Sequence, residues 1–220
     1  NSAAPYTFNG REQSVKGDSV VTGLLTGDKL TNLAYVSGQG NTGTNVTDHP
    51  VLLNAATVMD GRTDVTANYE LSFVPGRLVI VPLHVPEAQI PISDVNTVYD
   101  GEGHTITLPP TIRTDAGTVT LTDEFTVQYR DEHGNVTDTP PQYYDVGDHP
   151  ITVILTSISG NYDPDEVPTV VTITPRPLTA DYGDVSTLYD GLPHTVPLTV
   201  TGLVPRDTLY LTEVNRTATN

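Results

Sequence analysis

The chain has 220 residues, no cysteine, no tryptophan and a formal net charge of −17 at pH 7. The lack of cysteine excludes disulfides and thiolate metal sites. The acidic balance argues against nucleic acid as a partner, because neutralising phosphates requires clustered lysines and arginines. No stretch approaches the roughly 18 apolar residues that cross a bilayer, so direct membrane insertion is not expected.

The first regular element in chain order is the best helix candidate, residues 26–36 (TGDKLTNLAYV), where Asp28 would cap a short turn. The later patterns are those of strands, because apolar and β-branched residues alternate or run together between clusters of Gly, Pro, Asn and Asp. The expected strands cover residues 76–81, 104–108, 118–129, 150–156 and 169–174. The pattern therefore predicts an all-β protein.

A motif of an aromatic residue, Asp or Asn, and Gly occurs three times. The interval is 91 residues from Gly10 to Gly101 and 90 residues from Gly101 to Gly191, which is about one domain. Other landmarks recur at similar offsets, including an Asn-Tyr pair ahead of a final apolar strand. The residues assigned to this repeated framework are Phe8, Gly10, Tyr69, Tyr99, Asp100, Gly101, Tyr162, Tyr189, Asp190 and Gly191.

These intervals predict three repeat domains in tandem. The first covers residues 1–82 and lacks its first strand, the second covers residues 83–176 and is complete, and the third covers residues 177–220 and is partial. Prolines at the boundaries make the linkers short and stiff. Residues 24–30 (LLTGDKL) resemble residues 203–209 (LVPRDTL), so the first and third repeats are more alike.

The motif reads as a turn rather than as a catalytic group. Asp-Gly favours a tight turn because Gly tolerates positive φ and Asp bonds to its own backbone. The second and third copies add a histidine, His104 and His194, but the first copy has Asn9 for the Asp and Gln13 for the histidine. Those changes remove the carboxylate and the histidine that a catalytic site would need in every copy. We therefore expect the aromatic rings to pack in the core, and we expect no enzyme activity and no cofactor.

Two further sets of residues are ligand candidates. Acidic turns offer oxygen ligands at close spacing, and calcium often stiffens extracellular β-domains; the first candidates are Asp163, Asp165 and Glu166. Exposed tyrosines suit sugar rings, and the candidates for a glycan platform are Tyr129, Tyr143 and Tyr144. Tyr69 and Tyr162 are expected to lie in the core with their hydroxyls hydrogen-bonded to backbone.

The segments VYDG and LYDG, together with DVTANYELSFVPGRLVIVP and GNYDPDEVPTVVTITPRPL at the ends of the units, carry a family resemblance. They resemble the MBG and YDG-type Ig-like tandem repeats of very large bacterial cell-surface proteins, especially those of gut Firmicutes. The resemblance covers nearly the whole chain. It implies export, anchoring to the cell wall or envelope through regions outside this sequence, and a role in stalks or adhesins, with no catalytic residues to carry over.

The fold expected is a tandem of Ig-like β-sandwich repeats in an elongated array, or a β-grasp-like domain if residues 26–36 are helical. The expected function is an extracellular stalk of a bacterial adhesin that projects a distal binding region, with neighbouring repeats as its partners. One alternative is a module that binds host glycan or mucin. Another is a self-assembling filament, in which residues 177–220 pair their open edge with another chain.

Overall fold

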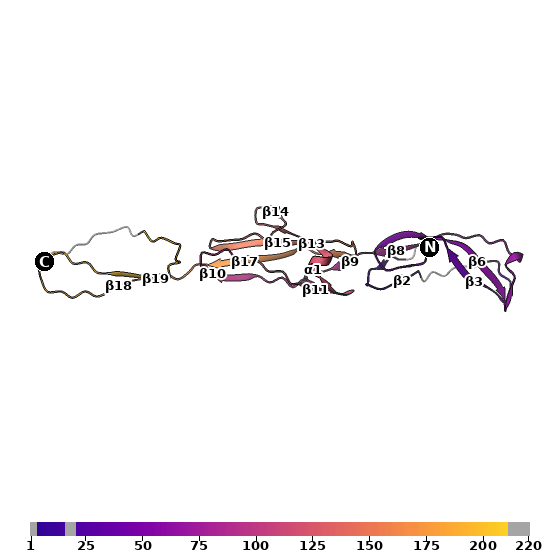
Figure 1. Cartoon of the computed structure of the whole chain (residues 1–220), viewed down its shortest axis with the longest axis horizontal. Coiled ribbons are helices and arrows are strands. Elements are labelled where there is room, and N and C mark those ends of the chain that lie inside the picture. Colours follow the sequence, from indigo (N-terminus) through magenta and orange to yellow (C-terminus); the bar gives the residue numbers. More distant parts are fainter. Residues whose placement is uncertain (1–3, 16–20, 211–220) are drawn as a thin grey trace. The chain divides into compact units, whose positions relative to one another are not determined.

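A computed structural model describes residues 4–15 and 21–210 (Figure 1). They form a mostly β structure with one short α-helix and two 3-10 helices. The chain divides into two compact units. The first contains Asn1–Pro91, Pro109–Val127 and Ile154–Val167, and the second contains Ile92–Leu108, Gln128–Val153 and Pro168–Asn220. This division does not test the predicted repeat boundaries, which stay a prediction.

The N-terminal part of the first unit consists of small sheets. In one sheet β8 lies between β1, which is parallel to it, and β5, which is antiparallel; in another, β6 lies between β3 and β7. β2 pairs with β4. The strands are β1 (Tyr6–Thr7), β2 (Gln13–Ser14), β3 (Asp28–Tyr35), β4 (Thr42–Gly43), β5 (Thr47–Val51), β6 (Leu53–Asp60), β7 (Thr63–Asp64) and β8 (Gly76–Val81).

The rest of the first unit contains the helices and two strand pairs. β9 runs parallel to β16, and β11 and β12 form an antiparallel hairpin that leads directly into α1. Leu121 of α1 and Ile112 of β11 are buried here. The elements are η1 (Thr66–Asn68), β9 (Leu83–Val85), η2 (Glu87–Gln89), β11 (Thr111–Thr114), β12 (Gly117–Thr120), α1 (Leu121–Glu124) and β16 (Tyr162–Pro164).

The largest sheet has five strands in the order β10-β17-β15-β13-β14. Its strands show the period of two that buries one face: Val167, Thr169, Val171 and Ile173 of β17 are buried, and the residues between them are more exposed. The strands are β10 (Val95–Val98), β13 (Phe125–Arg130), β14 (Val136–Thr137), β15 (Gly147–Ser157) and β17 (Val167–Thr174).

One pairing occurs twice. β1 is parallel to β8, and the Phe8 amide donates to the Val81 carbonyl at 2.9 Å. β10 is parallel to β17, and the Tyr99 amide donates to the Thr174 carbonyl at 2.9 Å. In both places the strand that leads into the aromatic–Asx–Gly motif lies beside the strand that ends at the linker proline. The chain thus builds the same local arrangement in two segments about 90 residues apart.

The C-terminal part of the described chain is a two-stranded antiparallel sheet, β18 (Thr179–Tyr182) with β19 (Leu198–Thr201). All four residues of β18 are exposed. The segment predicted to self-assemble, residues 177–220, is described as far as residue 210. Residues 211–220 lie outside the described part.

The strand predictions at 76–81, 150–156 and 169–174 are confirmed by β8, β15 and β17. The helix prediction at 26–36 is wrong, because Asp28–Tyr35 is strand β3 and pairs along β6. The alternative based on that helix loses its premise. Residues 104–108 form only a single bridge, between His104 and Tyr143. Residues 118–129 are not one strand, because α1 interrupts them.

Candidate functional site

The aromatic–Asx–Gly turns are the sequence feature that the structure develops furthest. In the second copy Gly101 has φ +78°, which L side chains rarely adopt. The Asp100 carboxylate accepts the Glu102 amide at 2.8 Å and faces His104 Nε2 at 2.9 Å. The backbone hydrogen bond from Glu102, followed by the bond with His104, lowers the pKa of Asp100. Asp100 and His104 thus hold each other and the turn.

The other two copies form the same turn. Gly10 and Gly191 have φ +72° and +75°. Asp190 accepts the Leu192 amide and faces His194 Nε2, both at 2.9 Å. In the first copy Asn9 Oδ1 accepts the Arg11 amide at 3.0 Å, and no histidine is needed. In all three positions the Asx side chain thus accepts the amide two residues further along, and the glycine between them has a positive φ.

In the second copy the turn is covered by the loop 204–207. The Tyr99 hydroxyl donates to Asp207 Oδ1 at 3.1 Å, and Arg206 forms an ion pair with Glu102. Burial, then the bond to Asp207, raises the pKa of Tyr99. A Cβ added at Gly101 would lie 3.0 Å from Val204 Cγ1, which leaves no room for a side chain. The loop and the turn form one close contact.

In the first copy the turn contacts a different segment of its unit. The Phe8 ring is buried, with its centroid 5.3 Å from that of Tyr162 in an edge-to-face arrangement. A Cβ added at Gly10 would lie 3.0 Å from the Ala116 carbonyl oxygen. Nearby, Asn161 Oδ1 accepts the Val46 amide at 2.9 Å. The Asn161-Tyr162 pair thus joins residues of the predicted second repeat to the predicted first one.

The two Asn-Tyr tyrosines differ from each other. Tyr162 is a core residue, as predicted, and its ring also lies against Phe125. Tyr69 is half-buried; its hydroxyl donates to the Asp28 carboxylate and accepts the Leu25 amide at 3.2 Å. The expected backbone partner is therefore present for Tyr69, together with a carboxylate that the sequence pattern did not indicate.

The third aromatic residue of the motif departs from the prediction of a packed ring. Tyr189 is 82% exposed, whereas Phe8 is 7% exposed. Its turn is nevertheless formed, with the Asp190 hydrogen bonds in place. The turn geometry therefore depends on local hydrogen bonds, while burial of the ring depends on the segment that covers it.

The calcium candidates are not assembled into a site. Asp165 Oδ2 accepts the Glu87 amide at 3.2 Å, and Asp165 Oδ1 lies 3.7 Å from His84 Nε2. The Asp163 backbone oxygen faces His84 Nδ1 at 3.1 Å. Within residues 4–15 and 21–210, no three His, Asp or Glu side chains group as a metal site, and that includes Asp163, Asp165 and Glu166.

The three tyrosines predicted as a glycan platform are not displayed together. Tyr129 is only 6% exposed, so the expectation of an exposed ring is wrong there, and burial raises the pKa of its phenol. Tyr143 stacks on the His149 ring at 4.3 Å. His149 Nδ1 lies 3.6 Å from Glu132 Oε1. Only Tyr144 is exposed, and its hydroxyl donates to Gln142.

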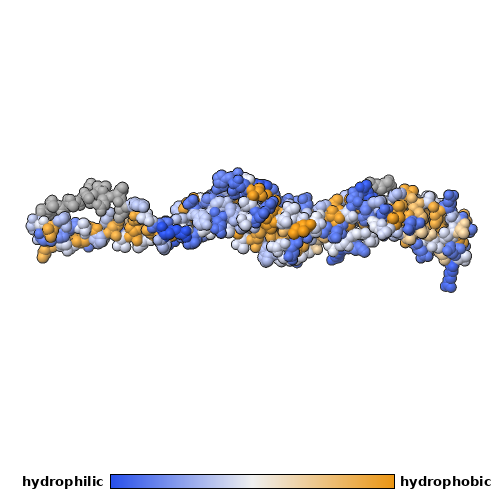
Figure 2. Space-filling model, turned by 45° about the horizontal axis from the view of Figure 1, so that its top comes forward, coloured by the Kyte–Doolittle hydropathy of each residue, from blue (hydrophilic) through white to orange (hydrophobic). Residues whose placement is uncertain are grey.

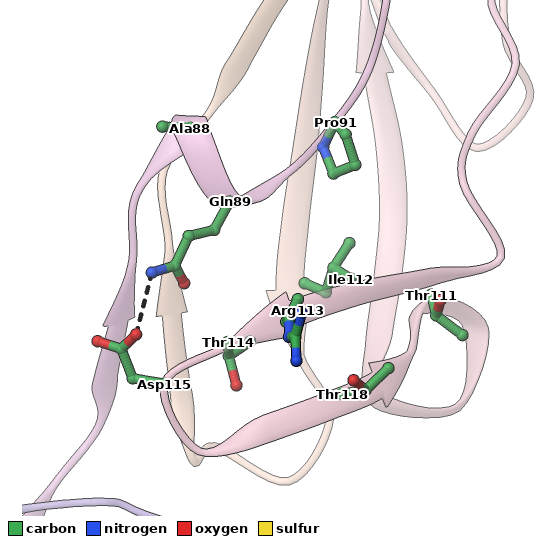
Figure 3. Close-up of a pocket in the computed structure, with 9 residues that line it drawn as sticks. All are labelled: Ala88, Gln89, Pro91, Thr111, Ile112, Arg113, Thr114, Asp115 and Thr118. Carbon is green, nitrogen blue, oxygen red and sulfur yellow. Dashed lines mark hydrogen bonds between the residues drawn. The ribbon is translucent and has the colours of Figure 1, made fainter.

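Sequence reasoning did not indicate the open groove between η2 and the β11–β12 hairpin (Figure 3). Gln89 reaches toward the hairpin and donates to Asp115 Oδ1 at 3.3 Å, as the dashed line in Figure 3 marks. Gln89 Oε1 is buried, and no hydrogen-bond partner for it is present among the described residues. No periodicity or motif in the sequence marks this groove. Its lining residues are Ala88, Gln89, Pro91, Thr111, Ile112, Arg113, Thr114, Asp115 and Thr118.

No protein-family model matches the chain, and no curated protein matches it. Among the described residues, no helix has the length and apolar character required to span a membrane.

Proposed function

We propose that the chain is a structural segment of a bacterial surface protein, a stalk of tandem Ig-like β-sandwich repeats that holds a distal binding region away from the cell. The repeated pairing supports this proposal most strongly. β1-β8-β5 and β10-β17-β15 have the same neighbours, with equivalent hydrogen bonds from Phe8 and Tyr99. A tandem duplication would produce two segments of the chain with the same sequence landmarks and the same strand pairing.

The contacts at the turns support a stiff array. Phe8 and Gly10 lie against Tyr162 and Ala116, and the Tyr99 turn is covered by the loop 204–207. Each contact joins residues that the sequence assigns to successive repeats. Contacts between neighbouring domains restrict their relative motion, and short proline-containing linkers act in the same direction. A stalk requires this stiffness because it must keep its length and carry tension along the chain.

A glycan-binding role has less support. A sugar platform needs several exposed rings on one surface, but Tyr129 is buried and Tyr143 stacks on His149. Tyr144 alone offers little area for a pyranose ring.

The test is small-angle X-ray scattering of the whole chain, extrapolated to infinite dilution, with the mass measured by light scattering. A single compact domain of this length would have a radius of gyration of about 17 Å, and an unfolded chain about 51 Å. A tandem array of folded repeats gives an intermediate value with an asymmetric distance distribution. A value near that of one compact domain would refute the array.

A further inference from the structure

The turn at Leu188–Leu192 is formed, and its apolar side chains are exposed within the part of the chain that the structure describes. Leu188 is 91% exposed, Tyr189 82% and Leu192 66%. Figure 2 shows apolar side chains gathered on the surface of the C-terminal part, at the left of the view. Asp190 holds this turn with the same two hydrogen bonds as Asp100 holds its own. Little rearrangement is needed before a partner binds, which reduces the entropic cost.

The second copy of the turn shows what kind of segment fits. There the loop 204–207 forms a tight turn, in which the Asp207 amide donates to the Val204 carbonyl at 2.9 Å. Val204 lies against Gly101 and is only 4% exposed, and Asp207 accepts the Tyr99 hydroxyl. An apolar side chain and a carboxylate three residues apart thus recognise the turn.

The same loop occurs once more, near the N-terminus. The segments LLTGDKL and LVPRDTL align residue for residue, which places Leu25 at the position of Val204 and Asp28 at that of Asp207. The Asp28 amide donates to the Leu25 carbonyl at 3.1 Å, the bond that closes the 204–207 turn. Leu25 is 72% exposed, whereas Val204 is buried. This loop therefore has both recognition residues, and its apolar side chain is exposed.

The two exposed surfaces also match in charge. In the occupied contact Arg206 pairs with Glu102. The alignment places Gly27 at the position of Arg206, and Leu192 at the position of Glu102, so both charges are absent together. One oxygen of Asp28 accepts the Tyr69 hydroxyl, and the other remains available because a carboxylate accepts several hydrogen bonds. An uncharged contact between Leu25, Gly27 and Leu192 would replace the ion pair.

We propose that the loop 24–28 of one copy docks on the turn 188–192 of a second copy, as residues 204–207 contact residues 99–102. Leu25 covers Gly191, and the Tyr189 hydroxyl donates to Asp28. The two surfaces are different, so the association is head to tail and open-ended. The inference depends on the geometry of the occupied contact and not on the proposed stalk role. The contact is small, and small contacts give weak, transient association.

The test is sedimentation velocity of the full chain at rising concentration. We expect the weight-average mass to rise above the 23.6 kDa of the monomer, with half-association on the order of 100 µM. Leu25→Asp and Tyr189→Asp should each abolish this rise. Val74→Asp and Tyr144→Asp should leave it within about twofold, because both residues are exposed and lie outside the two surfaces.

Mixing the two inactive variants makes the test specific. Leu25→Asp keeps an intact turn and Tyr189→Asp keeps an intact loop, so an equimolar mixture should form a dimer of twice the monomer mass and nothing larger. Circular dichroism confirms that each variant is folded. The proposal is overturned if the unmodified chain stays monomeric up to about 1 mM. This outcome would also be seen if the loop and the turn of one copy contacted each other, and it would overturn the proposal in that case too. The proposal is equally overturned if the mixture does not dimerise, or if Leu25→Asp still polymerises through another edge.

Discussion

Replacing Gly101 with Ala would test whether the loop 204–207 can cover the turn only when residue 101 has no side chain. Two costs follow from the structure. An L residue at φ +78° costs about 1–2 kcal/mol of backbone strain. The new Cβ would also lie 3.0 Å from both Val204 Cγ1 and Arg206 Nε, so the loop 204–207 must move away. Gly134→Ala is the matched control, since Gly134 has φ +84° and a Cβ added there would have no neighbouring atom within 4 Å.

The assay is amide hydrogen exchange measured by NMR, combined with urea unfolding. Both variants should lose about 1–2 kcal/mol of unfolding free energy from backbone strain. Only Gly101→Ala should speed exchange at the Asp207 amide, which donates to Val204 inside the covering loop. We expect at least a tenfold increase, equivalent to about 1.4 kcal/mol of local opening. Unchanged exchange at Asp207 in Gly101→Ala would refute the idea that the glycine is required for the contact.

Three further predictions concern the same turns and the acidic residues. Asp100→Asn should remove the pH dependence of the turn, because the lowered pKa of Asp100 contributes stability that is present above its ordinary value of 3.8 and is lost as the pH falls through the lowered value. The unfolding free energy of the unmodified chain in urea should therefore exceed that of Asp100→Asn near neutral pH and approach it in acid. A difference between the two that stays constant from neutral pH into acid would contradict the assignment. Phe8→Ala should lower the unfolding free energy by about 3–5 kcal/mol in urea, whereas Val74→Ala changes it by less than about 0.5 kcal/mol; equal effects would mean that the Phe8 ring does not join the segments. Calcium at about 5 mM should leave the thermal midpoint unchanged, because the acidic candidates are not grouped; a rise that Asp165→Asn abolishes would show a site.

The strands and turns that the sequence could predict are those with a strong local signal. β8, β15 and β17 contain short runs rich in β-branched and apolar residues, and such runs between turn residues indicate strands. The three turns were predictable because Gly at positive φ and a preceding Asp or Asn leave few other conformations. The signal failed at β3, where residues 28–35 suit a helix locally. Pairing with β6, between residues distant in sequence, decides that segment.

The contacts of the candidate site could not be predicted, because they depend on pairs that are far apart in the chain. Nothing local in VYDG indicates that Tyr99 reaches Asp207, 108 residues further along. Nothing local in LYDG indicates that the ring of Tyr189 is exposed. The α1 turn after β12 was missed for the opposite reason: its four residues carry too little periodicity to interrupt the expected strand.

Comparison of the three turns separates the role of the carboxylate from that of the ring. Asn9 forms the turn without charge and without a histidine, so neither proton transfer nor an ion pair is required for the geometry. Asp190 forms the same turn with an exposed ring beside it, so burial of the ring is not required either. What differs among the copies is the covering segment, Tyr162 and Ala116 in one and the loop 204–207 in another. The turn is thus a fixed, locally encoded surface, and its occupant determines whether the aromatic residue contributes to the core.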